Sequence, residues 1–124
     1  MLTQSDLRQF TGDLVRYRHQ LCPALLYTPG VQYLCEQGKA YWLLDAIASY
    51  QHDKRINSNE DARHLQFWTL KVNDSKAVLT CDDGNENVLI TQDIPYTDFP
   101  LDEAKVWVGM NGDGTRTAYI PSEH

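Results

Sequence analysis

The cysteines and histidines are the side chains of this sequence with the greatest capacity for metal or nucleophile chemistry. Cys22, Cys35 and Cys81 make an odd count, which argues against a framework of disulfides. The nearest approach to a zinc-ligand pair is His19-x-x-Cys22, and no second pair of that spacing accompanies it. Cys35 lies in an apolar helical pattern and Cys81 ends an apolar strand pattern, so both are predicted to be small core residues. We therefore expect no metal, no cofactor and reduced thiols, as in the cytoplasm.

The segment Asp82-Asp83-Gly84-Asn85-Glu86 has the oxygen-rich composition of a calcium loop. A helix–loop–helix calcium site needs oxygen ligands at alternate positions and a bidentate glutamate at the last of about twelve positions. Here the acids are adjacent, the flanking patterns are those of strands, and an aspartate stands where that glutamate is required. Asx residues beside a glycine instead favour a tight turn between two strands.

Catalytic motifs are missing from the sequence, which has neither a G-x-S-x-G motif nor a glycine-rich phosphate loop. We therefore expect a protein that is not an enzyme. One alternative stays open, a small enzyme or ligand-binding domain with a pocket between a sheet and the helix predicted over 40–50. Asp45 follows Tyr41 by one helical turn, and a carboxylate in so apolar a helix needs a partner. That partner is a tyrosine hydroxyl or an arginine, unless Asp45 is a functional acid in a pocket with Tyr41 and Tyr96.

The segment between Pro95 and Pro100 is predicted to be an ordered connector, because each proline fixes its own φ and restricts the residue before it. It contains Tyr96, Asp98 and Phe99. Two aromatic rings and an acid on a stiff segment can form a binding edge of the kind that anchors an interface. The alternative is a crossover in which Tyr96 and Phe99 only cap the core.

Charge is distributed unevenly along the chain. Acids outnumber bases by 17 to 11, giving a net charge of -6, which disfavours a general phosphate-binding surface. Residues 1–72 carry a net charge of +1 and residues 73–124 a net charge of -7. Solubility alone can explain such a bias, or the acids can face a basic partner protein, including one whose nucleic-acid site they would occupy. The candidate binding residues are Asp82, Asp83, Glu86, Tyr96, Asp98, Phe99, Asp102 and Glu103. The acids among them, together with Asp93, lie mostly in predicted turns and are expected to be exposed. We expect no direct binding to nucleic acid or to membranes.

Helix signals dominate the first part of the chain. Ser5 is predicted to cap a short helix that Gly12 ends, and Thr28 with Pro29 is a stronger start signal. The run from Ala40 to Tyr50 is apolar on most of its circumference and is expected to be the buried helix. The polar stretch over 51–63 is predicted to be a long loop.

Strand signals follow, because the hydrophobic period changes to two. Strands are predicted over 65–72, 76–81, 87–94, 105–110 and 115–120. The fold class is therefore α+β, with N-terminal helices packed on an antiparallel sheet of about five strands formed by the C-terminal half. A chain of 124 residues is expected to form a single domain over 1–124. The polar N-terminus has no secretory-signal pattern, and no apolar run reaches the length of a membrane helix.

Several phrases of the sequence occur together in a known order. They are 27–34 (YTPGVQYL), 40–48 (AYWLLDAIA), 68–72 (WTLKV), 94–101 (IPYTDFPL) and a terminal 121–123 (PSE). In combination they resemble a family of small uncharacterised bacterial proteins, a domain of unknown function met in cyanobacteria and on plasmids and phages. The resemblance implies a compact domain of mobile-element or host origin, and it implies no activity, ligand or catalytic residue.

Overall fold

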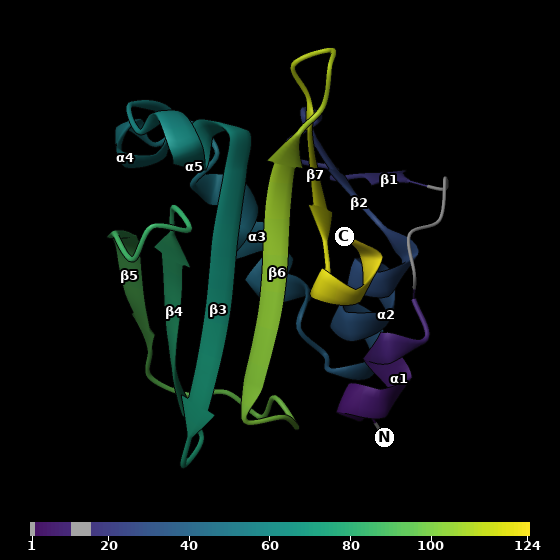
Figure 1. Ribbon diagram of the computed structural model, residues 1–124. Helices are drawn as coiled ribbons and strands as arrows, with labels where there is room; N and C mark the ends of the chain where they lie inside the picture. Colours follow the sequence, from purple (N-terminus) through teal and green to yellow (C-terminus); the bar gives the residue numbers. More distant parts are fainter. Residues whose placement is uncertain (1, 11–15) are drawn as a thin grey trace.

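The computed structural model describes residues 2–10 and 16–124. They form an α+β structure with a seven-stranded mixed sheet in the order β1-β2-β7-β6-β3-β4-β5. Figure 1 shows α3 behind the sheet, whereas the front of β3, β4 and β6 is uncovered. None of the helices within these residues is long and apolar enough to cross a bilayer. The elements are α1 (Gln4–Arg8), β1 (Tyr17–Arg18), β2 (Leu25–Tyr27), α2 (Pro29–Gln37), α3 (Tyr41–Ser49), α4 (Lys54–Asn57), α5 (Glu60–His64), β3 (Leu65–Asn73), β4 (Lys76–Asp82), β5 (Val88–Ile94), β6 (Glu103–Met110), β7 (Arg116–Tyr119) and the 3-10 turn η1 (Pro121–Glu123).

The sheet is larger than predicted and is not wholly antiparallel. The five strands expected from the alternating pattern are β3 to β7, and they pair with one another antiparallel. Two short strands from the N-terminal half, β1 and β2, extend the sheet, and β2 runs parallel to β7. Leu25 is fully buried at this junction. Strands of two and three residues are too short to show a period of two, so the sequence pattern did not reveal them.

Helix α2 begins where the sequence predicted. Thr28 is its N-cap, and the Thr28 hydroxyl accepts a hydrogen bond from the backbone N–H of Val31, with Pro29 at the first helical position. Helix α1 begins two residues earlier than expected, because Thr3 rather than Ser5 is the cap. Gly12, the expected end of α1, lies outside the described residues.

The C-terminal turn closes onto the start of α2. The Glu123 carboxylate accepts hydrogen bonds from the Thr28 hydroxyl (2.6 Å), from the backbone N–H of Ile120 (3.0 Å) and from that of Gly30 (3.3 Å). A Cβ atom at Gly30 would lie 2.5 Å from a Glu123 carboxylate oxygen, so only glycine allows this approach. Two of the phrases that carry the family resemblance, 27–34 and 121–123, therefore contact each other, and their role here is structural.

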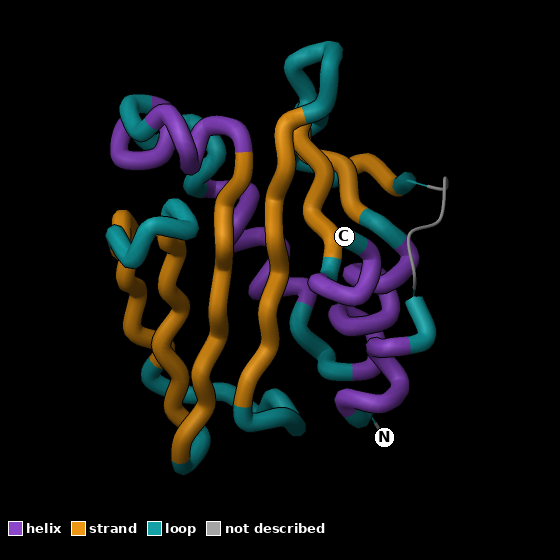
Figure 2. Tube along the Cα trace, viewed as in Figure 1, coloured by secondary structure: helices purple, strands orange, loops and turns teal. Residues whose placement is uncertain are grey.

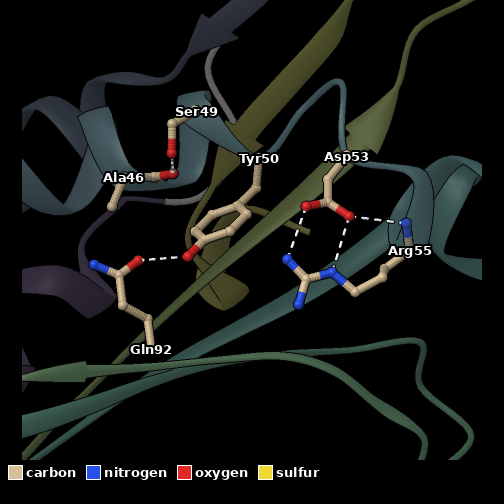
Figure 3. A network of polar contacts seen from close by, with 6 residues as sticks. All are labelled: Ala46, Ser49, Tyr50, Asp53, Arg55 and Gln92. Atoms are coloured by element: carbon tan, nitrogen blue, oxygen red, sulfur yellow. Dashed lines mark hydrogen bonds and ion pairs between the residues drawn. The ribbon is translucent and has the colours of Figure 1, made fainter.

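Helix α3 covers the back of the sheet with its apolar face, as expected for 40–50. Leu44 and Ile47 are 2% and 0% exposed. At the end of the helix the Tyr50 hydroxyl donates to Gln92 of β5 at 2.7 Å (Figure 3). The Tyr50 ring also lies 5.5 Å from the ring of Trp68. These contacts fix the helix against β3 and β5.

The prediction of a long loop over 51–63 is wrong, because this stretch forms α4 and most of α5 (Figure 2). Asp53 caps α4 by accepting from the backbone N–H of Arg55, whose guanidinium also pairs with it at 2.8 Å (Figure 3). Asn59 caps α5, since its side-chain oxygen accepts a hydrogen bond from the backbone N–H of Ala62. Each helix buries one apolar side chain, Ile56 in α4 and Ala62 in α5. One buried residue gives no helical period, and the caps were the only available signal.

The uncovered face of the sheet carries a row of aromatic rings. Phe67 and Trp107 have centroids 5.0 Å apart, Trp107 and Tyr119 6.2 Å, and Tyr119 and His124 5.7 Å. Gly84 lies against the Phe67 ring, since a Cβ atom there would approach it to 2.7 Å. The row therefore joins neighbouring strands, the β4–β5 turn and the C-terminus by ring packing.

Candidate functional site

The connection between β5 and β6, residues 95–102, is anchored to the lower end of the sheet (Figure 1). The backbone N–H of Thr97 donates to the Ser75 carbonyl in the β3–β4 turn at 2.8 Å. The Thr97 hydroxyl accepts from the backbone N–H of Phe99 at 3.1 Å, and both side chains are 5% exposed. Phe99 packs against Gly38, the C-cap of α2, where a Cβ atom would lie 2.7 Å from the ring. The connection is thus held by two inward side chains.

The residues that alternate with these anchors point to solvent. Tyr96 is 72% exposed, whereas Phe99 is buried, so the core-capping interpretation is correct for Phe99 and wrong for Tyr96. Asp98 and Asp102 are exposed too, and neither carboxylate forms a hydrogen bond or an ion pair with the described residues. We call Tyr96, Asp98 and Asp102 the connector edge.

Glu103 and Asp93 flank the connector edge. Glu103, at the start of β6, is half-buried; its carboxylate lies 3.8 Å from the Lys105 ammonium and its carbonyl accepts from Gln4. Asp93 is exposed near the end of β5. Of the predicted acids in this region, Glu103 therefore has a carboxylate near a cation, whereas the carboxylates of Asp93, Asp98 and Asp102 have no hydrogen-bond or ion-pair partner among the described residues.

Asp83 is not exposed, which corrects the prediction for the β4–β5 turn. It is 5% exposed and accepts hydrogen bonds from the side chains of Asn87 and Asn59, both at 3.0 Å, and from the backbone N–H of Asn85 at 2.9 Å. The Asn87 side chain, followed by the Asn85 backbone, lowers the pKa of Asp83 to about 2. Asp83 therefore ties α5's cap to the turn and is not available to a partner.

The rest of this segment forms the predicted turn. Asp82 accepts from the backbone N–H of Gly84, and Gly84 and Glu86 both adopt positive φ, of 83° and 68°. No group of three or more His, Cys, Asp or Glu side chains within the described residues is placed to hold a metal ion. Glu86 is the exposed acid of the turn.

The predicted binding residues do not form one surface. Asp82, Asp83 and Glu86 precede β5, whereas the connector edge follows it, so the two groups lie at opposite ends of that strand (Figure 1). Only the group after β5 combines an exposed aromatic ring with unengaged carboxylates.

The alternative pocket is only partly assembled. Tyr41 and Asp45 line a cavity of about 270 Å³ together with His19, Gln20, Leu21, Tyr27 and Leu44, but Tyr96 does not line it. Tyr41 donates its hydroxyl to Glu36 at 3.2 Å, and partial burial together with the Glu36 carboxylate raises the pKa of Tyr41 to about 12. Tyr41 is therefore a protonated donor and cannot act as a base near neutral pH.

Asp45 has a partner that the sequence did not suggest. Its carboxylate lies 2.8 Å from Nε2 of His19, which is 7% exposed. Nδ1 of His19 accepts from the backbone N–H groups of Leu21 (3.1 Å) and Cys22 (3.0 Å), so Nε2 carries the proton and donates to Asp45. Both ring nitrogens are engaged, and this geometry leaves no nitrogen free for general-base catalysis.

The thiols expected in the core are there. Cys35 and Cys81 are 1% and 0% exposed, and burial raises the pKa of each to about 12. Cys22 is partly exposed. Sequence reasoning overlooked Arg116, a cation that is 8% exposed at the start of β7. Its only sequence signal is that it is one of three basic residues in the acidic half of the chain.

The chain belongs to a family described as "Family of unknown function (DUF6876)", which matches residues 1–124. This confirms the resemblance to an uncharacterised family. The chain is similar to a solved structure described as "Crystal structure of the protein of unknown function from Enterococcus faecalis". The similarity covers 90% of this chain and 93% of that chain, with 19% sequence identity and a TM-score of 0.56. At that identity the similarity concerns the fold alone. No curated protein matches the chain.

Proposed function

We propose that this protein is a non-enzymatic interaction module that binds a basic protein partner through the connector edge. The observation that carries the proposal is Tyr96, whose side chain is 72% exposed on a segment held in place by buried Thr97 and Phe99. An aromatic ring on a pre-ordered segment loses little conformational freedom on binding, which is the property of an interface anchor.

The chemistry of the connector edge selects a cationic partner. The face of a tyrosine ring attracts a guanidinium or ammonium group, and the carboxylates of Asp98 and Asp102 can accept charge-assisted hydrogen bonds from the same group. The surrounding half of the chain has a net charge of -7 over residues 73–124, which steers a basic protein toward this side. An arginine-rich segment of the partner fits these groups best.

The wider setting of the proposal comes from the sequence phrases. A bacterial host or a mobile element is the proposed context, and the basic partner would be a component of a nucleic-acid-targeting host system whose binding site the acidic surface occupies. Such a protein would act as an inhibitor by competing with nucleic acid for a basic surface.

The proposal is tested by capturing partners with matched variants. The connector variant combines Tyr96→Ser, Asp98→Asn and Asp102→Asn. The distal variant combines Val88→Ser, Glu86→Gln and Glu60→Gln, which remove the same charge and one exposed apolar side chain at the other end of β5.

Each tagged protein is incubated with host lysate, and bound proteins are identified by mass spectrometry. We expect the wild type and the distal variant to retain the same basic protein and the connector variant to lose it. Retention of that protein by the connector variant, or enrichment of acidic proteins only, would contradict the proposal.

A further inference from the structure

We propose that a second site, built around Arg116, binds a small oxyanion, the phosphate or carboxylate group of a ligand. The guanidinium lies at the upper end of the sheet, at the start of β7. Four of its N–H groups are directed at neutral oxygens: the Gln51 carbonyl (3.0 Å) and side-chain oxygen (3.2 Å), the Asn57 side-chain oxygen (2.8 Å) and the Arg63 carbonyl (3.2 Å).

No carboxylate of residues 2–10 or 16–124 forms an ion pair with this buried charge. The ion pairs found in the described part of the chain are His19–Asp45, Arg55–Asp53 and Lys105–Glu103. A charge taken out of water is costly unless a counter-charge accompanies it, and neutral oxygens compensate only part of that cost. Burial, and then the positive charge of nearby Arg63, lower the pKa of Arg116. The positive charge of Arg63 therefore adds to that of Arg116 near this end of the sheet.

A cavity lies beside the guanidinium. Its volume is about 220 Å³, enough for several water molecules at about 30 Å³ each, and it is lined by Cys22, Ala24, Gln51, His52, Asn57, Met110, Gly114 and Arg116. His52 is exposed at this cavity and makes no hydrogen bond that the described structure records. An imidazole that can donate thus lines the same space as a buried guanidinium, whose positive charge and remaining N–H group, on Nε, can act on an oxyanion.

A purely structural role for Arg116 explains only part of the arrangement. Its hydrogen bonds tie the end of α3, α4 and α5 to β7, so it does hold these elements together. A structural clamp of this kind would be stabilised further by an aspartate or glutamate at 51 or 57, yet both positions are amides. Gln51 and Asn57 orient the guanidinium and leave its charge for a ligand.

Protection of Cys22 gives a direct readout of the site. Cys22 lines the cavity and is partly exposed, whereas the other two thiols are buried, so an alkylating reagent should modify Cys22 first. The alkylation rate is followed by mass spectrometry during titration with inorganic phosphate, acetate or succinate, with chloride holding the ionic strength constant. We expect saturable protection by at least one oxyanion. The anion with the lowest apparent Kd for protection then distinguishes a phosphate ligand from a carboxylate ligand.

Variants assign that protection to the proposed groups. Arg63→Gln and His52→Ala alter exposed side chains and should each weaken the apparent Kd for the protecting anion by about fivefold, the first by removing one solvent-screened charge and the second by removing one hydrogen-bond donor. Lys71→Gln, an exposed lysine of β3, is the matched control and should leave the Kd unchanged. Arg116→Gln should abolish protection; if that variant does not fold, the Arg63 and His52 variants decide. Protection that does not saturate with anion concentration would overturn the proposal. The proposal would also be overturned if Arg63→Gln, like Lys71→Gln, left the Kd unchanged.

Discussion

Asp83 shows at the level of a single residue how an acid in an acidic segment can be structural. Its carboxylate is enclosed by donors from Asn59, Asn85 and Asn87, and these hold its pKa at about 2. Because the folded-state pKa lies below the usual value of about 4, the ionised group stabilises the fold above pH 4. That stabilisation is lost as the pH falls from about 4 to about 2.

Asp83→Asn is therefore expected to lower the free energy of unfolding at pH 7, since the amide cannot accept from every one of these donors. The difference from the wild type should shrink between pH 4 and pH 2, as measured by urea denaturation at each pH. Asp98→Asn, at an exposed position, is the control and should follow the wild type. Equal stability of Asp83→Asn and wild type at pH 7 would show that the hydrogen bonds of Asp83 do not stabilise the fold.

Sequence reasoning identified residues whose role is local and missed those whose role depends on distant partners. The Thr28 cap and the β4–β5 turn depend on neighbours within a few positions, and both were predicted correctly. Asp45 pairs with His19, which lies 26 positions away, so no spacing rule could indicate it. Asp83 was expected at the surface because it lies in a predicted turn, and its partner Asn59, 24 positions away, gave no local signal.

Helix α3 is the element whose burial the sequence predicted most directly. Leu44→Ala or Ile47→Ala should each lower the free energy of unfolding by about 2–5 kcal/mol, because each removes a nearly fully buried side chain and leaves a cavity. Ser49→Ala on the exposed side of the same helix is the control, with an expected change within about 0.5 kcal/mol. Chemical denaturation measures all three. Losses below about 0.5 kcal/mol at both apolar positions would contradict this placement of the core.

The contact between Glu123 and the start of α2 predicts a change of sign in a double-mutant cycle. Glu123→Ala removes an acceptor from three donors and should cost about 0.5–2 kcal/mol, as loss of a helix cap does. Gly30→Ala displaces the same carboxylate and should also destabilise the wild type.

In the Glu123→Ala background nothing remains to be displaced. There Gly30→Ala should be neutral or stabilise by up to about 1 kcal/mol, because alanine favours the helix more than glycine does. Thermal denaturation of the four proteins gives the coupling free energy. Simple additivity of the two substitutions would show that Glu123 and Gly30 do not interact.

The elements that the sequence predicted are those with enough residues to show a period. Strands β3 to β6 have seven to nine residues and were found within two positions of their bounds. The short strands β1 and β2 and the one-turn helices α4 and α5 were missed, because tertiary contacts rather than periodicity stabilise them. Three residues that line the Arg116 cavity belong to missed elements or adjoin them: Ala24 precedes β2, His52 precedes α4, and Asn57 lies in α4. That site was therefore not accessible to sequence reasoning.

At the scale of the whole molecule, the proposed protein site and the proposed anion site lie at opposite ends of the sheet. Asp74, between β3 and β4, and Asp98 and Asp102, between β5 and β6, are exposed acids of the lower connections. Arg116 and Arg63 lie near α4 and α5 at the upper end, where the β4–β5 turn with Glu86 also lies. The net charges of the two sequence halves did not indicate this placement, and the fold shows that the exposed aromatic Tyr96 lies among the lower acids. A basic protein and a small anion would therefore bind at different ends.

The central claim is that the connector edge steers and anchors a basic protein. The most direct test is the association rate of the captured partner with the wild type, the connector variant and the distal variant, measured over a range of salt concentrations. The account predicts that the wild-type rate falls by about tenfold or more between low and high salt, and that the connector variant is slower at low salt and depends less on salt. The distal variant should retain more of the wild-type rate than the connector variant does. A rate that is indifferent both to salt and to the connector substitutions would contradict the claim.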